Sequence, residues 1–161
     1  MLKTVHFRKT RDYLGQVKEA SQKVEMLKSR ITLYEESGMN PGALAAELET
    51  AMQTLLSKKV EISDMIARIP AVEYQWILIK RYVELMSWDD IAVDGNTNRR
   101  QVVSIHGLAL PEMQDVLVDA GIVAPEDAED ITGLLPDEGT LDTGTMADYL
   151  KYREEKKRGE V

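Results

Sequence analysis

The chain has 161 residues, of which 43% are hydrophobic and 30% charged, and its formal net charge is −8. This composition suits one or two small domains that bury a core. The absence of cysteine excludes disulfides and thiolate metal ligands, and the two histidines, His6 and His106, are too few and too far apart in sequence for a zinc site. No membrane-spanning run or signal peptide is recognisable, so we expect a cytoplasmic location and no membrane partner.

The charge is unevenly distributed along the chain. Residues 1–34 carry eight Lys or Arg against three Asp or Glu, whereas residues 117–150 carry nine Asp or Glu and no Lys or Arg. The net charge therefore reflects mainly an acidic tail, for which we expect partial disorder. A flexible linker is expected over 136–145 and one short helix over 146–158.

The first predicted helix covers about residues 11–36, and Gly15 is the one weak helix former inside it. A glycine suited to the helix end, Gly38, follows. Apolar residues repeat with the 4-3 spacing of a coiled-coil seam. These residues are Tyr13, Val17, Ala20, Val24, Leu27, Ile31 and Tyr34.

A second helix is predicted from Asn40-Pro41, since Asn suits the cap position and Pro the first helical residue. Its seam contains Leu44, Leu48, Ala51, Leu55, Lys58, Ile62, Met65 and Ile69. Lys58 either sets the register or partner choice, or simply extends outward. The short connection predicts an antiparallel hairpin over 1–69. Such a hairpin buries little surface, so we expect a homo-oligomer or docking on another protein; a three-helix bundle with the next helix is the alternative.

Residues 70–116 carry the pattern of a helix-turn-helix domain. Pro70 precedes a helix over 71–85, and Ser87 caps a short helix. The turn Asp94-Gly95-Asn96 follows, and Thr97 or Asn98 caps a last helix that we expect to end at Leu110, before Pro111.

The outward face of this last helix is the candidate DNA-reading surface, because Val102, Ile105 and Ala109 form its inner stripe. Arg is suited to guanine, and Asn or Gln to adenine, at the start of a recognition helix. Four polar residues at a helix start can occur on any solvated helix. The prediction that they face DNA therefore depends on their position directly after the helix-turn-helix turn. The exposed positions are Asn98, Arg99, Arg100, Gln101, Val103 and Ser104.

The segments 81–82, 86–92, 99–102 and 105–110 resemble phage and prophage proteins that join a coiled coil to a helix-turn-helix of the sigma-factor region-four type. The sequence is similar to the ArpU and RinA groups of late-gene transcription regulators. The resemblance implies double-stranded DNA and RNA polymerase as partners in a bacterial host cell. It also implies that Arg99, Arg100, Val103, Ser104 and Gly107 face the major groove.

Three positions depart from that family. Gly95 stands where a leucine is usual, which removes a small core contact, and Asn96 stands where glycine is usual, a mild change because Asn tolerates the left-handed conformation. Leu108 stands at a position that is often basic, which removes an expected phosphate contact. These departures bear on DNA affinity more than on the fold.

Several other residues have two interpretations. His106 either contacts a phosphate or is a partly buried structural histidine. Lys80 and Arg81, like Thr97, are candidate DNA contacts, although the two cations also suit a plain solvated face. Trp76 and Trp88 are expected in the core.

The sequence therefore predicts an all-α protein with a helical hairpin (1–69), a helix-turn-helix domain (70–116) and an acidic tail (117–161). No catalytic motif, metal site or cofactor site is recognisable, so we expect no enzyme. The predicted function is a DNA-binding late-gene regulator. The alternatives are a small-terminase-like packaging adaptor and a helix-turn-helix protein used only for protein contacts.

Overall fold

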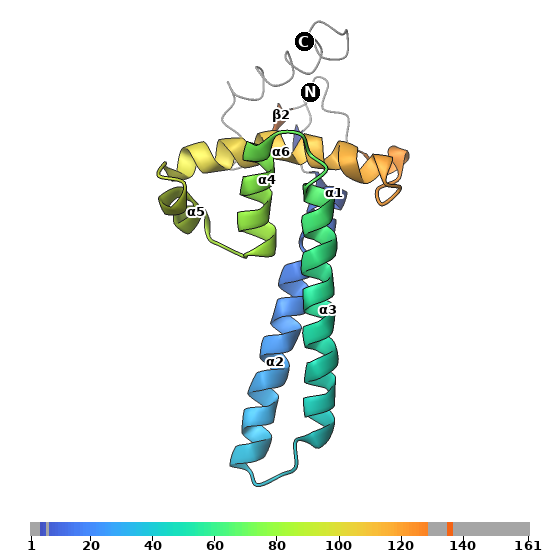
Figure 1. Cartoon of the computed structure of the whole chain (residues 1–161), viewed down its shortest axis with the longest axis vertical. Coiled ribbons are helices and arrows are strands. Elements are labelled where there is room, and N and C mark those ends of the chain that lie inside the picture. Colours follow the sequence, from blue (N-terminus) through green and yellow to red (C-terminus); the bar gives the residue numbers. More distant parts are fainter. Residues whose placement is uncertain (1–3, 6, 129–134, 137–161) are drawn as a thin grey trace, which may run out of the picture.

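The computed structural model describes residues 4–5, 7–128 and 135–136, and the described part is helical apart from one two-residue pairing (Figure 1). The all-α class is therefore confirmed for that part. Its elements are β1 (Thr4–Val5), α1 (Arg8–Leu14), α2 (Gln16–Glu36), α3 (Gly42–Ile66), α4 (Val72–Leu78), the π-helix η1 (Ile79–Val83), α5 (Trp88–Asp94), α6 (Arg99–Asp119), the 3₁₀ turn η2 (Pro125–Asp127) and β2 (Leu135–Pro136), which pairs in parallel with β1. The predicted linker beyond Pro136 and the predicted helix over 146–158 lie outside the described residues, as does His6.

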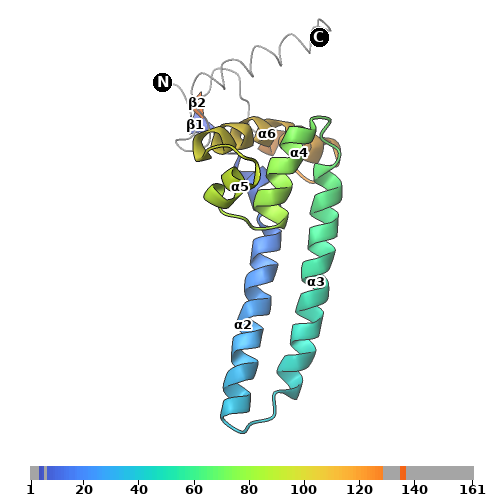
Figure 2. The same ribbon diagram turned by 60° about the vertical axis from the view of Figure 1, so that its left-hand side comes forward.

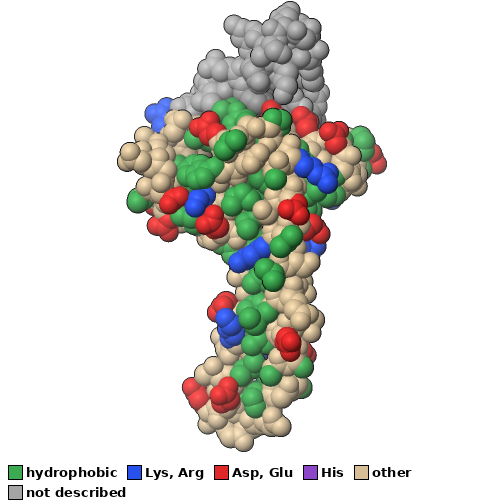
Figure 3. Space-filling view, in the orientation of Figure 1, with side chains coloured by type: hydrophobic (Ala, Val, Ile, Leu, Met, Phe, Trp, Pro, Cys, Tyr) green, Lys and Arg blue, Asp and Glu red, His purple; other side chains and the backbone are tan. Residues whose placement is uncertain are grey.

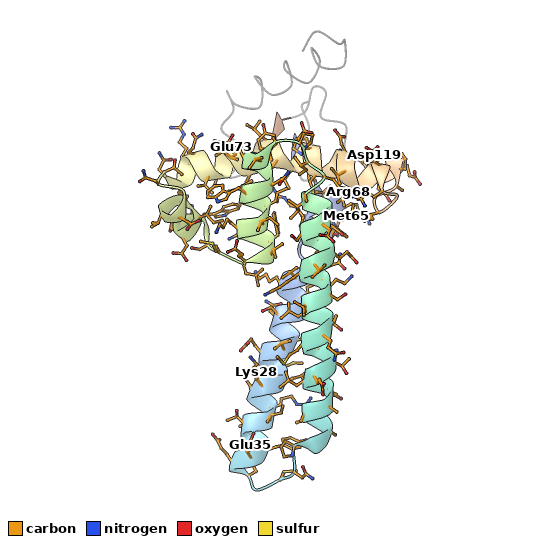
Figure 4. All side chains as sticks on the ribbon, in the orientation of Figure 1. Lys28, Glu35, Met65, Arg68, Glu73 and Asp119 are labelled. Atoms are coloured by element: carbon orange, nitrogen blue, oxygen red, sulfur yellow. The ribbon has the colours of Figure 1, made fainter. Side chains whose placement is uncertain are left out.

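Helices α2 and α3 lie side by side and form a projecting arm (Figures 1 and 2). Gly38 adopts a φ of 73°, as expected for a glycine after a helix end. The expected start of the second helix is displaced by one residue, because Pro41 is the N-cap and α3 begins at Gly42. Asn40 precedes the cap, and its Oδ1 accepts a hydrogen bond from Gly42 N at 2.9 Å. The helix expected from about residue 11 begins at Arg8 and is divided at Gly15 into α1 and α2. Figure 4 places Glu35 at the far end of the arm and Met65 at its junction with the other helices.

A small core holds the outer half of the arm together. The seam positions Val24, Leu27, Leu44 and Ala51 are buried there, as the 4-3 spacing predicts. Lys58 is half exposed and lies 3.8 Å from Glu61 on its own helix, which fits the interpretation that it extends outward.

The main core lies where the base of the arm (α1 with the adjoining turns of α2 and α3) meets α4, η1, α5 and α6, which together form the head. The base of the arm supplies part of this core, because residues from α1, α2 and α3 are buried in the same cluster as residues of the head. The buried side chains of this core that precede α4 in the chain are Phe7, Tyr13, Leu14, Val17, Ile62, Met65, Ile66 and Ile69. Arm and head are therefore held by one continuous apolar contact.

Helix α6 is longer than the sequence predicted. The expectation that it ends at Leu110 is wrong, because α6 continues to Asp119 with Pro111 inside it. An internal proline removes one backbone hydrogen bond and costs about 3 kcal/mol. Pro111 itself is buried, and the burial of Met113 and Leu117 in the main core offsets that cost, so tertiary packing overrides the local signal.

The start of the acidic segment belongs to this packing. Gly121 ends α6 with a φ of 75°, and the backbone nitrogens of Ile122 and Val123 donate to Leu117 O at 2.9 and 3.2 Å. Val123 is buried against the core. The boundary expected at residue 116 thus falls inside α6.

The helix expected over 71–85 is also modified. It is α-helical to Leu78 and then widens into the π-helix η1, a change for which the apolar pattern gives no signal. Leu85 follows with a φ of 58°, in the left-handed region.

Candidate nucleic-acid interface

Helices α5 and α6 are joined by the four residues 95–98, and each helix is capped by the side chain that precedes it. Ser87 Oγ accepts from Asp90 N at 3.1 Å, and Asn98 Oδ1 accepts from Gln101 N at 2.9 Å. Of the two predicted caps for α6, the structure uses Asn98. Asn96 adopts a φ of 52°, as expected for an asparagine at this turn.

Gly95 is required by the shape of its neighbour. A Cβ at residue 95 would lie 2.6 Å from Cη2 and 3.1 Å from Cζ2 of Trp76. The expectation that Gly95 leaves a core contact unmade is therefore corrected, because the indole of Trp76 occupies the space. Trp76 and Trp88 both pack against the main core, as predicted.

The predicted DNA contacts fall into two groups. Thr97 to Gln101 are exposed at the start of α6, and Val103 is half buried. Ser104 is only 7% exposed and Gly107 is buried, so the expectation that they face outward is wrong. Residues 104–107 are all buried, and four consecutive residues cover the full circumference of a helix. The middle of α6 is therefore enclosed, and its first turn is the accessible part.

Lys80 and Arg81 both have partners within the head. Lys80 Nζ lies 3.2 Å from an oxygen of Asp94 and 3.4 Å from one of Glu84, and the hydrogen bond that Lys80 donates to Asp94 raises the pKa of Lys80. Arg81 lies over the Trp88 ring at 4.2 Å and donates to Met86 O at 3.0 Å. Both cations thus connect η1 to the chain that follows it.

Acidic side chains flank the start of α6. Arg99 lies 3.8 Å from Asp89, with both side chains largely exposed, a distance and setting that make a weak ion pair. Asp90 and Asp94 occupy the same short helix, α5. A polyanion approaching Arg99 therefore competes with a carboxylate that is already beside it.

His106 is a buried structural histidine, which decides between its two interpretations. It is 3% exposed, its Nε2 shares a 2.7 Å hydrogen bond with Tyr82 OH, and Trp88 packs edge-on at 4.8 Å. Burial, and then the charges of Arg11 and Arg81, lower the pKa of His106 to about 3. The ring is therefore neutral at pH 7, and its Nδ1 has no hydrogen-bond partner in the described structure.

A groove that sequence reasoning missed lies between the base of the arm and the head. It encloses about 560 Å³, and its lining includes Arg11, Lys18, Arg81, Tyr82, Trp88 and His106. These residues come from α1, α2, η1, α5 and α6, so no local pattern brings them together. The nearest signal was the basic character of residues 1–34.

No family model, curated protein or solved structure matches the chain. Within the described ranges, the structure contains no group of three His, Cys, Asp or Glu residues placed to hold a metal ion. None of the helices described here combines the length and apolarity needed to cross a membrane.

Proposed function

We propose that the chain is a DNA-binding regulator of the phage late-gene type, in which α5 and α6 act as a helix-turn-helix. The observation that carries the proposal is the exposed, Asn98-capped first turn of α6, with Arg99, Arg100 and Gln101 directly after a tight turn. Helix-turn-helix proteins present the N-terminal residues of the second helix to base edges. Arginine suits guanine there, and glutamine suits adenine.

The accessible reading surface at the start of α6 is short, because residues 104–107 that follow it are buried. One head then contacts few base pairs, and two heads are needed for a site of useful length. The arm supports such pairing, since apolar side chains are exposed along it (Figure 3). Large apolar side chains of the arm with about half or more of their surface exposed are Met26, Leu33, Met52, Leu56 and Val60. We propose the arm as the contact with a second copy or with RNA polymerase.

A second candidate is a helix-turn-helix used only for protein contacts. The burial of Ser104 and Gly107 and the ion pairs of Lys80 favour it, because they reduce the cationic surface available to phosphate. The packaging-adaptor alternative differs in its assembly. A ring of about eight or more subunits is typical of adaptors, whereas a dimer is typical of regulators. The mass in solution separates these two.

The test is selection of random genomic DNA fragments at two salt concentrations with the full chain. The Arg99→Ala/Arg100→Ala variant is compared with Lys23→Ala/Arg30→Ala, which removes the same charge from exposed positions on α2. The proposal expects a defined site that the first variant loses and the second retains, with unchanged helical CD. No enrichment at either salt, or equal loss in both variants, contradicts DNA reading by α6.

A further inference from the structure

The groove at the base of the arm is the strongest unassigned feature of the described structure. It is lined by polar and apolar side chains from the arm base, η1, α5 and α6. Its volume of about 560 Å³ lies within the range of small-molecule sites. A ligand there would contact the arm and the head together.

The charge of the groove has one sign. Arg11, Lys18 and Arg81 line it, and among the residues that the structure describes no Asp or Glu does. Arg81 is held in place by its stacking on Trp88 and its hydrogen bond to Met86 O. A positioned guanidinium keeps further N–H donors for a carboxylate or phosphate.

Two polar atoms of the lining residues have no partner. Arg11 Nε and His106 Nδ1 are hidden from solvent without a hydrogen bond. When Tyr82 donates its hydroxyl proton to Nε2, the neutral imidazole carries its own proton on Nδ1, so both atoms are then donors. Buried donors of native proteins normally have an acceptor, so both residues carry an unused donor beside the groove.

We propose that this groove binds a small anionic ligand through its phosphate or carboxylate oxygens, with Arg11, Lys18 and Arg81 as the charged contacts. Ser21, Gln22 and Tyr82 are further polar residues of the lining. Binding draws α1, α2 and η1 together and stabilises the junction of arm and head. This site is separate from the first turn of α6 and does not depend on DNA binding.

The probe is sodium diphosphate, titrated against sodium chloride at matched ionic strength and observed by ¹⁵N NMR of the tryptophan indoles. The chain has two tryptophans, and Trp88 lines the groove whereas Trp76 packs on Gly95. We expect the Trp88 signal to shift with a saturable dependence while the Trp76 signal stays in place. Equal shifts of both, or the same shift with chloride, overturn the proposal.

Matched variants test the contacts by calorimetry. Lys18→Gln removes an exposed lining cation, and Lys23→Gln removes an exposed cation of the same helix outside the groove. We expect diphosphate affinity to fall about threefold in Lys18→Gln, about tenfold or more in Arg11→Gln, and not in Lys23→Gln. Equal affinities in Lys18→Gln and Lys23→Gln, or no binding by the wild type, contradict the proposal.

A short DNA duplex at the same phosphate concentration distinguishes the source of the anion. The small-anion site requires a response of Trp88 to diphosphate, and it requires that Arg99→Ala/Arg100→Ala leaves this response unchanged. The proposal is overturned, and the groove is assigned to the DNA backbone, when Trp88 responds to the duplex but not to diphosphate. The same conclusion follows when the diphosphate response is lost in Arg99→Ala/Arg100→Ala. Loss of DNA reading with intact diphosphate binding would separate this site from the proposed function.

Discussion

The indole of Trp76 lies where a side chain at residue 95 would have to stand, 2.6 Å from the position of a Cβ atom. The turn before α6 is thereby in close contact with α4. Replacing Gly95 by Ala forces the ring or the turn to move. We expect a loss of about 1–3 kcal/mol in the free energy of unfolding, measured by urea denaturation.

The double variant Trp76→Phe/Gly95→Ala is the control, because phenylalanine lacks the ring atoms Cη2 and Cζ2 that approach Gly95. The cost of Gly95→Ala should be clearly smaller in the Trp76→Phe background. An equal cost in both backgrounds would show that Trp76 does not determine the residue at position 95.

A second prediction concerns acid. The folded-state pKa of His106, about 3, lies below its ordinary value of 6.5, so the unfolded chain takes up the proton first. The contribution of the neutral His106 ring to the free energy of unfolding is therefore fully present above pH 6.5 and is lost as the pH falls. The free energy of unfolding should decrease by about 2 kcal/mol between pH 7 and pH 5. Urea denaturation at these two pH values measures the decline.

The matched variant is His106→Gln, which keeps a polar group beside Tyr82 but does not titrate. Its stability should change less between pH 7 and pH 5 than that of the wild type, although its absolute stability is lower. Identical pH dependence in the two proteins would assign the acid sensitivity to other groups.

Leu85 provides a third prediction, because it has a φ of 58° and is 37% exposed. A left-handed leucine costs roughly 1–2 kcal/mol, which glycine relieves, while glycine also adds entropy to the unfolded chain. We therefore expect Leu85→Gly to change the free energy of unfolding by less than about 0.5 kcal/mol. Leu33→Gly, an exposed site inside α2, should cost about 1 kcal/mol or more. Equal costs at the two sites would argue against strain at Leu85.

The helix caps give a fourth prediction. Ser87 accepts a hydrogen bond from Asp90 N, so Ser87→Ala should lower stability by about 1 kcal/mol. Ser29→Ala, at an exposed position within α2, is the comparison and should be neutral or slightly stabilising. Thermal unfolding followed by CD measures both, and a neutral Ser87→Ala would show that the cap is not needed.

Local signals in the sequence predicted local features well. The caps at Ser87 and Asn98 and the left-handed Asn96 follow from the side chain and its neighbours in the chain, so a pattern of a few residues suffices. The 4-3 spacing likewise predicted which side chains the arm buries.

The errors arose where distant segments meet. Pro111 reads as a helix end, yet it is buried inside α6 by contacts that only the assembled head supplies. A single inner stripe on α6, formed by Val102, Ile105 and Ala109, places Ser104 on the outer face of the helix. In the structure residues 104–107 are all buried, so the middle of α6 has no outer face. Arg11 and His106 both line the basic groove although they are far apart in sequence. A periodic pattern within one helix cannot predict that two such distant residues lie close together.

The continuous core at the junction fixes the position of the arm on the head. Helix α3 has 25 residues and is therefore about 38 Å long, and its last turns are buried with the head (Figures 1 and 2). A partner molecule bound at the tip of the arm would then be held at a fixed distance from α6. Lengthening both α2 and α3 by one heptad moves that partner outward by about 10 Å without altering either contact surface, so arm length is a separately adjustable property of this molecule.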